Sequence, residues 1–165
     1  MEKVVIALTA LFIIVSVWLM FGGNLFDPAR KSDVMPEASG ISEEIGRGTV
    51  VEQDFTCSVS SFSEIAIVFT KAYIAESGSL VVELRENDEV LASQSIPLSS
   101  IRDQHRTYLK LNRKLTDTLN KEYTIVIYPG GDYDTGVMIM TADKSGSSYR
   151  FGKQKINGSL CFAVA

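Results

Sequence analysis

The chain has 165 residues, of which 45% are hydrophobic, and a net charge of −4 from 16 basic and 20 acidic side chains. This acidic balance argues against a nucleic-acid binder, which presents a basic face to phosphates. A single long apolar stretch excludes a polytopic transporter, and two cysteines are too few for a disulfide-rich scaffold. Residues 24–165, which follow that stretch, suffice for one domain with its own core.

The apolar stretch runs from Val4 to Phe21 without a charged side chain. As a continuous helix it would be about 27 Å long, close to the hydrocarbon thickness of about 30 Å. Aromatic rings from Trp18 to Phe21 lie near one end, as at a membrane interface. No small-residue cleavage pattern follows. We therefore predict that residues 1–23 are an uncleaved transmembrane anchor, with a cleaved signal peptide as the alternative.

Basic residues do not decide the orientation of this anchor, because Lys3 precedes it and Arg30 and Lys31 follow it. A three-residue N-terminal tail can remain in the cytoplasm while the large C-terminal domain is translocated across the membrane. We therefore expect a single-pass protein of the cell membrane that contacts lipid through residues 4–21 and carries its C-terminal domain on the extracytoplasmic side.

Residues 24–47 are rich in proline, glycine and small or charged residues, and no apolar period of 2 or 3.6 is present. This composition predicts a flexible linker. Ser42–Glu44 is a weak helix start, after which the pattern shows no apolar face to bury.

Beyond Gly48 the pattern changes to short alternating runs, as in Leu80, Val82 and Leu84, which alternate with Ser79, Val81, Glu83 and Arg85, and this is typical of half-buried strands. The run Ile65–Phe69 is apolar on both faces and predicts a central strand. Asn157-Gly158 is a strong signal for a two-residue hairpin, and Leu98–Gln104 is the only helical hint. Eight or nine strands are expected, near 49–57, 64–71, 79–86, 89–96, 107–112, 121–128, 136–142, 148–152 and 159–164.

These elements predict an all-β fold over residues 48–165, an antiparallel β-sandwich of jelly-roll type, preceded by one N-terminal transmembrane helix. Four stretches also resemble a known module: Gly78–Arg85, Glu89–Gln94, Lys121–Ile127 and Asn157–Phe162. Over residues 50–165 the chain resembles the galactose-binding-like jelly-roll modules on the extracytoplasmic face of bacterial glycosyltransferase-type, polysaccharide-assembly membrane proteins.

In those proteins the module is usually attached to a polytopic membrane region, which leads us to expect either a free-standing anchored module or a shortened piece of a larger protein. The resemblance implies an extracytoplasmic address and contact with carbohydrate, and it implies no enzymatic activity.

Catalytic patterns are sparse. The single histidine, His105, has no nucleophile motif near it and is interpreted as a solvated loop residue. Cys57 and Cys161 with one histidine do not form a zinc motif, and no glycine-rich phosphate loop is present. We expect no enzyme, no cofactor and no metal.

The segment Tyr128–Gly136 is the candidate ligand loop. Tyr128 and Tyr133 could stack on the apolar faces of sugars, while Asp132 and Asp134 could accept hydrogen bonds from sugar hydroxyls. A calcium loop is an alternative, although the twelve-residue pattern and its terminal glutamate are missing. A solvated hairpin loop, with Asp and Gly present for turn geometry, is the simplest alternative.

Strand parity bears on the two cysteines. If Val51 and Phe55 face the core, Cys57 also faces it, whereas Cys161 points away if Leu160 and Phe162 face the core. Cysteines on opposite faces cannot reach the Cβ separation of about 3.5–4.5 Å that a disulfide needs. Two unpaired thiols are therefore predicted. The alternative is a disulfide, which a bulge in the first strand or an early end of it near Thr56 would allow by reversing the parity.

The expected function is that of a membrane-anchored, extracytoplasmic, non-catalytic module that binds carbohydrate or a cell-envelope partner. The alternative is a structural or assembly subunit that pairs with another membrane protein, such as a polytopic glycosyltransferase. A pilin-like subunit is disfavoured because Pro28 and Pro36 would break a continuous helix.

Overall fold

The computed structural model describes residues 34–73 and 77–165. In these residues no helix is long and apolar enough to cross a membrane, and the predicted anchor lies outside them. The described chain forms short strands and one 3₁₀ turn, η1 (Leu98–Ser100). The strands are β1 (Gly40–Ile41), β2 (Val51–Thr56), β3 (Ser61–Lys71), β4 (Ser79–Glu86), β5 (Glu89–Pro97), β6 (His105–Thr116), β7 (Glu122–Pro129), β8 (Val137–Ala142), β9 (Ser148–Phe151), β10 (Gln154–Asn157), β11 (Ser159–Leu160) and β12 (Phe162–Val164).

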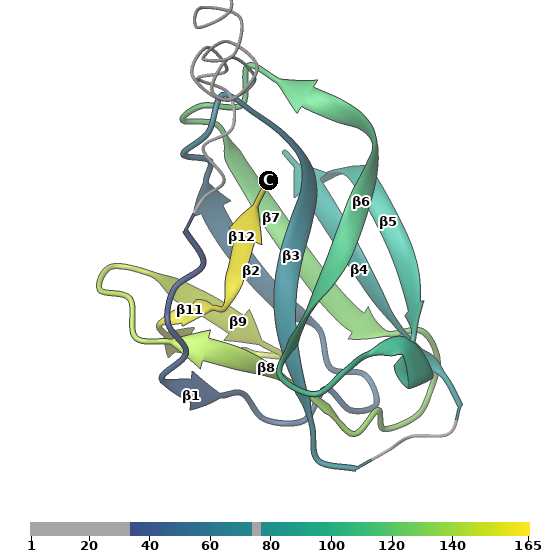
Figure 1. Cartoon of the computed structure of the whole chain (residues 1–165). Helices are drawn as coiled ribbons and strands as arrows, with labels where there is room; N and C mark the ends of the chain where they lie inside the picture. Colours follow the sequence, from purple (N-terminus) through teal and green to yellow (C-terminus); the bar gives the residue numbers. More distant parts are fainter. Residues whose placement is uncertain (1–33, 74–76) are drawn as a thin grey trace, which may run out of the picture. The chain divides into compact units, whose positions relative to one another are not determined.

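Two antiparallel sheets make up this part of the chain (Figure 1). One, here called the β7 sheet, has the strand order β10-β9-β2-β7-β4-β5. The other, the β3 sheet, has β1, β8 and β3 side by side, with β6 and β12 paired to β3 and β11 paired to β8. The predicted all-β antiparallel sandwich is therefore confirmed over residues 34–165.

The strand pairs are nested along the chain. β4 pairs with β5, β3 with β6, β2 with β7 and β1 with β8, as in one long hairpin folded back on itself. Asn87 and Asp88 form its tip, and both have positive φ (49° and 67°), as a type I′ turn requires. β9 and β10 extend the β7 sheet beyond β2.

The prediction of a hairpin at Asn157-Gly158 is wrong. The strand before it, β10, pairs with β9, whereas the strand after it, β11, pairs with β8 in the other sheet. The β9–β10 turn instead contains Gly152, whose φ of 58° suits a tight turn. Asn-Gly can form a turn in a hairpin or in a crossover between sheets, and only the partners of the flanking strands decide between the two.

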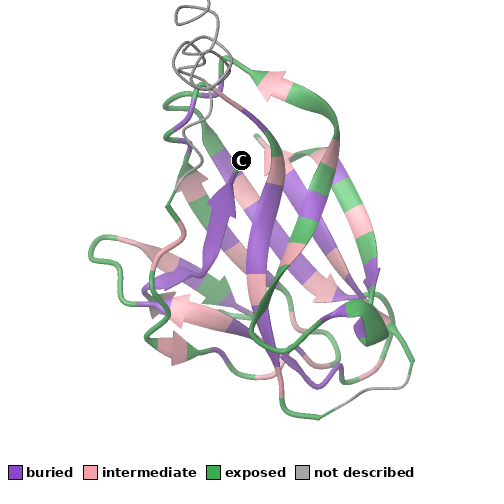
Figure 2. Ribbon diagram, in the orientation of Figure 1, coloured by how far each residue is buried: buried purple, intermediate pink, exposed green. Residues whose placement is uncertain are grey.

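The core confirms the predicted alternation. Leu80, Val82 and Leu84 are fully buried, and Ile65, Ile67 and Phe69 of β3 face them as part of the same cluster. Figure 2 shows this buried band along β3, β4 and β7. As predicted, β3 is a central strand, because β6 lies on one side of it and β8 and β12 lie on the other.

Part of the predicted linker packs on the sandwich. Gly40–Ile41 is strand β1, paired with Thr141 and Met140, and the side chain of Ile45 is fully buried in the core. The backbone amide of Ile45 donates to Val137 O at 2.8 Å. The expectation that nothing apolar follows Ser42–Glu44 to be buried is thus wrong, because one isoleucine between polar residues has no period to reveal it.

Both cysteines are free and buried. Cys57 belongs to the core cluster, and its thiol donates to Val59 O at 3.4 Å. Leu160 and Phe162 are also in that cluster, whereas Cys161 between them is not. Burial raises the pKa of the Cys161 thiol. Cys57 follows the end of β2 at Thr56, and Cys161 lies between β11 and β12, so neither belongs to a strand. The prediction of two unpaired thiols is confirmed, whereas the strand parity behind it does not apply directly to these positions.

Candidate functional site

Tyr133 of the predicted ligand loop closes the loop onto strand β4. Its hydroxyl donates to Ser79 O at 2.9 Å and accepts from the Ser79 amide at 2.6 Å. The ring lies close to Gly78 and Gly131, where an added Cβ would come within 2.7 and 2.6 Å of ring carbons. Both the hydroxyl and the ring of Tyr133 are thus used inside the protein.

The two aspartates of this loop contact the segment before β2. Asp134 Oδ1 accepts from the backbone amide of Arg47 at 3.0 Å, and Asp132 Oδ1 pairs with Arg47 Nε at 3.0 Å. The Arg47–Asp132 pair is largely exposed, so it contributes little stability. In the described residues no group of three or more His, Cys, Asp or Glu side chains could hold a metal ion.

Tyr128 lies on the outer face of the β7 sheet. Its hydroxyl donates to Glu83 Oε1 at 2.7 Å, and this bond raises the pKa of Tyr128. Tyr128 and Asp132 also line a shallow pocket of about 420 Å³, which contains neither Tyr133 nor Asp134. Of the four predicted ligand residues, the structure thus brings Tyr128 and Asp132 together at this pocket and leaves Tyr133 and Asp134 outside it.

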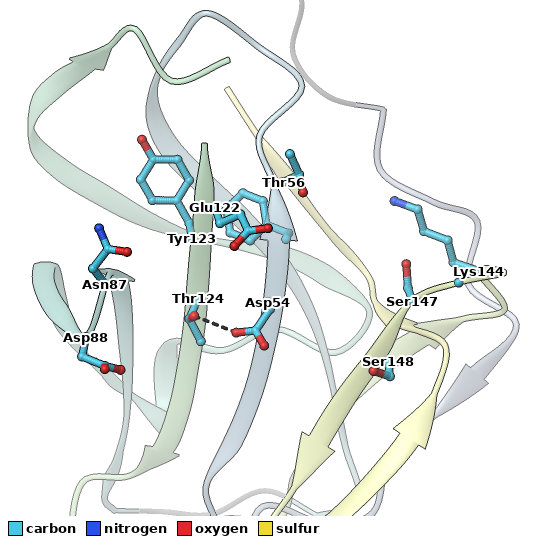
Figure 3. A pocket seen from close by; sticks show the side chains of 12 residues that line it. Asp54, Thr56, Asn87, Asp88, Glu122, Tyr123, Thr124, Lys144, Ser147 and Ser148 are labelled. Atoms are coloured by element: carbon cyan, nitrogen blue, oxygen red, sulfur yellow. Dashed lines mark hydrogen bonds between the residues drawn. The ribbon is translucent and has the colours of Figure 1, made fainter. Parts of the chain in front are cut away.

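A larger pocket, of about 670 Å³, lies at the ends of β2 and β7 (Figure 3). Figure 3 shows Asp54, Glu122 and Thr124 between the β4–β5 turn and the segment Lys144–Ser148. The pocket draws on four stretches of chain that are distant in sequence. Its lining residues are Asp54, Phe55, Thr56, Asn87, Asp88, Glu122, Tyr123, Thr124, Lys144, Gly146, Ser147 and Ser148.

Polar oxygens dominate this pocket, which we call the β2–β7 pocket. Thr124 Oγ1 donates to Asp54 Oδ1 at 2.7 Å, which orients the Asp54 carboxylate (Figure 3). Asp88, Glu122 and Lys144 are exposed, and the ion pairs found in the described residues involve none of these three. The pocket therefore offers carboxylates, hydroxyls, an amide and an ammonium group to a ligand.

The aromatic residues of the β2–β7 pocket form its base. The Phe55 and Tyr123 ring centroids are 5.8 Å apart, and Phe55 packs edge-on against Phe162 at 5.0 Å. Burial raises the pKa of Tyr123 to about 12. Tyr123 is 3% exposed, so only the half-buried Phe55 ring is accessible for an apolar contact.

Sequence reasoning missed this pocket. Asn87-Asp88 was recognisable as a turn, but nothing along the chain joins it to Asp54 or Ser147, because the β4–β5 turn meets β2 and β7 only through sheet pairing. His105 does not line it, and its Nδ1 lies 2.7 Å from the carbonyl oxygen of Asp103.

No protein-family model matches the chain, and no curated protein sequence matches it.

Proposed function

We propose that the chain is a membrane-anchored, extracytoplasmic, non-catalytic module that binds carbohydrate in the β2–β7 pocket. One observation carries this proposal: polar side chains from four chain segments converge on a single open pocket of about 670 Å³. Sugars present many hydroxyl groups, and each needs a donor or acceptor that is not already paired within the protein.

The strand arrangement supports the jelly-roll interpretation. Four nested antiparallel pairs, β1·β8, β2·β7, β3·β6 and β4·β5, are what a long hairpin produces when it rolls into two facing sheets. This topology agrees with the resemblance to galactose-binding-like modules, which motivates carbohydrate as the ligand class.

The composition of the β2–β7 pocket favours binding over catalysis. Neither histidine nor cysteine, the side chains that most often serve as general base or as nucleophile, lines it. Asp54, which accepts from Thr124, is placed to orient a ligand hydroxyl.

Binding can be tested with the full chain in detergent on a glycan array, followed by titration of the best glycan. Asp54→Asn and Asp88→Asn should each weaken binding roughly tenfold, the effect of one lost hydrogen bond to a charged group. Asp132→Asn is the matched control and should leave affinity unchanged. Loss of affinity in the Asp132 variant alone would instead favour the shallow pocket beside Tyr128, and no bound glycan would contradict carbohydrate binding.

The anchor is tested separately. Because Val4–Phe21 is long enough to span a bilayer, detergent should be needed to release the chain from membranes. Recovery of most of the protein in an alkaline carbonate wash would contradict the anchor without bearing on the pocket.

A second function, that of an assembly subunit, is favoured by the sheet edge at β10, whose one partner among the described strands is β9. An unpaired strand edge can accept a strand from another protein. Crosslinking in membranes that yields one stoichiometric protein partner, with no glycan bound, would favour this function.

A further inference from the structure

Basic side chains are concentrated at strand β6. Within an acidic chain of net charge −4, five of the 16 lysines and arginines fall between residues 102 and 114. All five are exposed. Among the described strands, β6 pairs with β3 alone and is therefore an edge strand (Figure 1). The group, here called the β6 basic cluster, consists of Arg102, Arg106, Lys110, Arg113 and Lys114.

None of these cations forms an ion pair in the part of the chain that the structure describes. The ion pairs found there involve Arg47, Arg85, Lys121 and Arg150 instead. Asp103 is the one acidic residue between positions 102 and 114, and its Oδ1 accepts a hydrogen bond from the backbone amide of Lys71 at 3.0 Å. Glu64 is the cross-strand partner of Lys110 on β3, so this lysine has a carboxylate beside it, although the two form no ion pair. The cluster therefore keeps most of its positive charge free for a ligand.

A pocket of about 460 Å³ lies at one end of this cluster. Arg102 and Arg106 line it together with Ser100, His105, Thr107 and Tyr108. Two guanidinium groups beside one pocket match the oxygens of a phosphate group. Tyr108, 40% exposed, adds an amphipathic ring of the kind that favours the membrane interface.

Protection of a strand edge does not account for the whole cluster. Lysines on edge strands deter pairing with other chains, which explains Lys110. Yet the Lys110 amide already donates to Gln94 Oε1 at 3.3 Å, and Arg102 precedes the strand. A ligand that is broad and negatively charged explains all five positions.

The predicted anchor would bring one such ligand, the membrane surface, close to the β6 basic cluster. Residues 22–33 join the predicted anchor to the first described residue, and they span at most about 40 Å when fully extended. A domain tethered this closely meets the bilayer surface at a high effective concentration. Anionic lipid attracts basic groups that come within a Debye length, about 8 Å at physiological salt.

We propose that the β6 basic cluster docks on the anionic phospholipid surface of the membrane that holds the anchor, with a lipid phosphate in the pocket between Arg102 and Arg106. Docking fixes the orientation of the sandwich on the bilayer. The proposal rests on the anchor of the proposed function and is independent of its carbohydrate pocket.

The test is amide hydrogen exchange on the full chain in nanodiscs of phosphatidylcholine, with and without phosphatidylglycerol. Amides of residues 101–118 should exchange roughly fivefold more slowly when anionic lipid is present, and high salt should abolish the difference. The double variant Arg106→Gln/Lys110→Gln should lose this protection. Lys153→Gln/Lys155→Gln removes the same charge from the exposed β9–β10 hairpin and should retain it.

Equal exchange in both lipids, or equal loss in both double variants, would overturn the proposal. Protection by soluble polyphosphate without any effect of phosphatidylglycerol would also overturn it and identify a polyanion as the ligand. Unchanged exchange in β7 verifies that the variants are folded. If the chain does not enter nanodiscs, the anchor fails, and cosedimentation of the same chain with anionic vesicles tests the cluster by itself.

Discussion

The Glu44 carboxylate accepts a hydrogen bond at 2.8 Å from the backbone amide of Gly136, 92 positions further along the chain. The same oxygen accepts from the Tyr73 hydroxyl at 3.0 Å, which raises the pKa of Tyr73. Thr135 adds a bond to Ile45 O at 2.6 Å. Residues of the predicted linker thus hold the loop between β7 and β8 in place.

Glu44→Ala should lower the free energy of unfolding by about 1–2 kcal/mol, because it leaves a partly buried amide without its acceptor. Urea denaturation measures this. Glu43→Ala, which removes the same charge from an exposed neighbour, should change stability by less than about 0.5 kcal/mol. Equal effects would mean that charge, not the Gly136 bond, matters.

Ile45→Ala should destabilise the domain by about 2–4 kcal/mol, since the side chain is fully buried in the core. Ile41→Ala is the matched control, because Ile41 is 53% exposed, and a shift of about 0.5 kcal/mol or less is expected. A small effect at Ile45 would instead show that residues 40–47 do not pack on the sandwich and act as a flexible linker.

Tyr133→Phe should cost about 1–2 kcal/mol of stability, because the Ser79 amide loses its acceptor, and should leave glycan affinity unchanged. Tyr108→Phe at an exposed site controls for loss of a hydroxyl. If the Tyr133→Phe variant had normal stability but bound glycan more weakly, Tyr133 would be a ligand contact, as the sequence predicted.

Glu83 should make stability depend on pH. Burial raises its pKa, but hydrogen bonds from Tyr128 and Arg85 outweigh burial and lower the pKa below its ordinary value. A lowered pKa in the folded state stabilises the protein above the unfolded pKa, and this contribution disappears as pH falls through the folded one. Glu83→Gln should therefore be less stable than wild type at pH 7, with a gap that narrows below about pH 4.

Urea titrations at several pH values measure this gap. Glu89→Gln, at the exposed start of β5, is the control and should parallel wild type throughout. A Glu83→Gln gap that stays constant with pH would show that ionisation of Glu83 does not stabilise the fold.

Both thiols should resist modification in the native protein, because each cysteine is only 1% exposed. After denaturation without reductant, alkylation should add two labels per chain, as detected by mass spectrometry. No label before reduction and two afterwards would reveal a disulfide and refute the parity argument.

The sandwich was predictable because each strand carries its own pattern. Leu80, Val82 and Leu84 occupy every second position because one face of the strand packs on the core, and this period of 2 is visible locally. Turn residues such as Asn87-Asp88 are equally local, because positive φ favours the same residue types in any fold.

The sites were not predictable in the same way. The four loop residues resemble a ligand site in sequence, yet Tyr133 bonds to Ser79 and Asp134 to Arg47, partners that no local pattern indicates. The β2–β7 pocket joins Asp54 to Asn87 and Ser147 through sheet pairing alone.

By itself, the sequence determined the class of the fold and its central strand, because the hydrophobic period is a property of adjacent residues. Only the tertiary structure decided that Ile45 enters the core, that Asn157-Gly158 joins two sheets, and which polar groups remain free. Those outcomes depend on pairing between distant strands, where burial and hydrogen bonding select partners that adjacent residues do not specify.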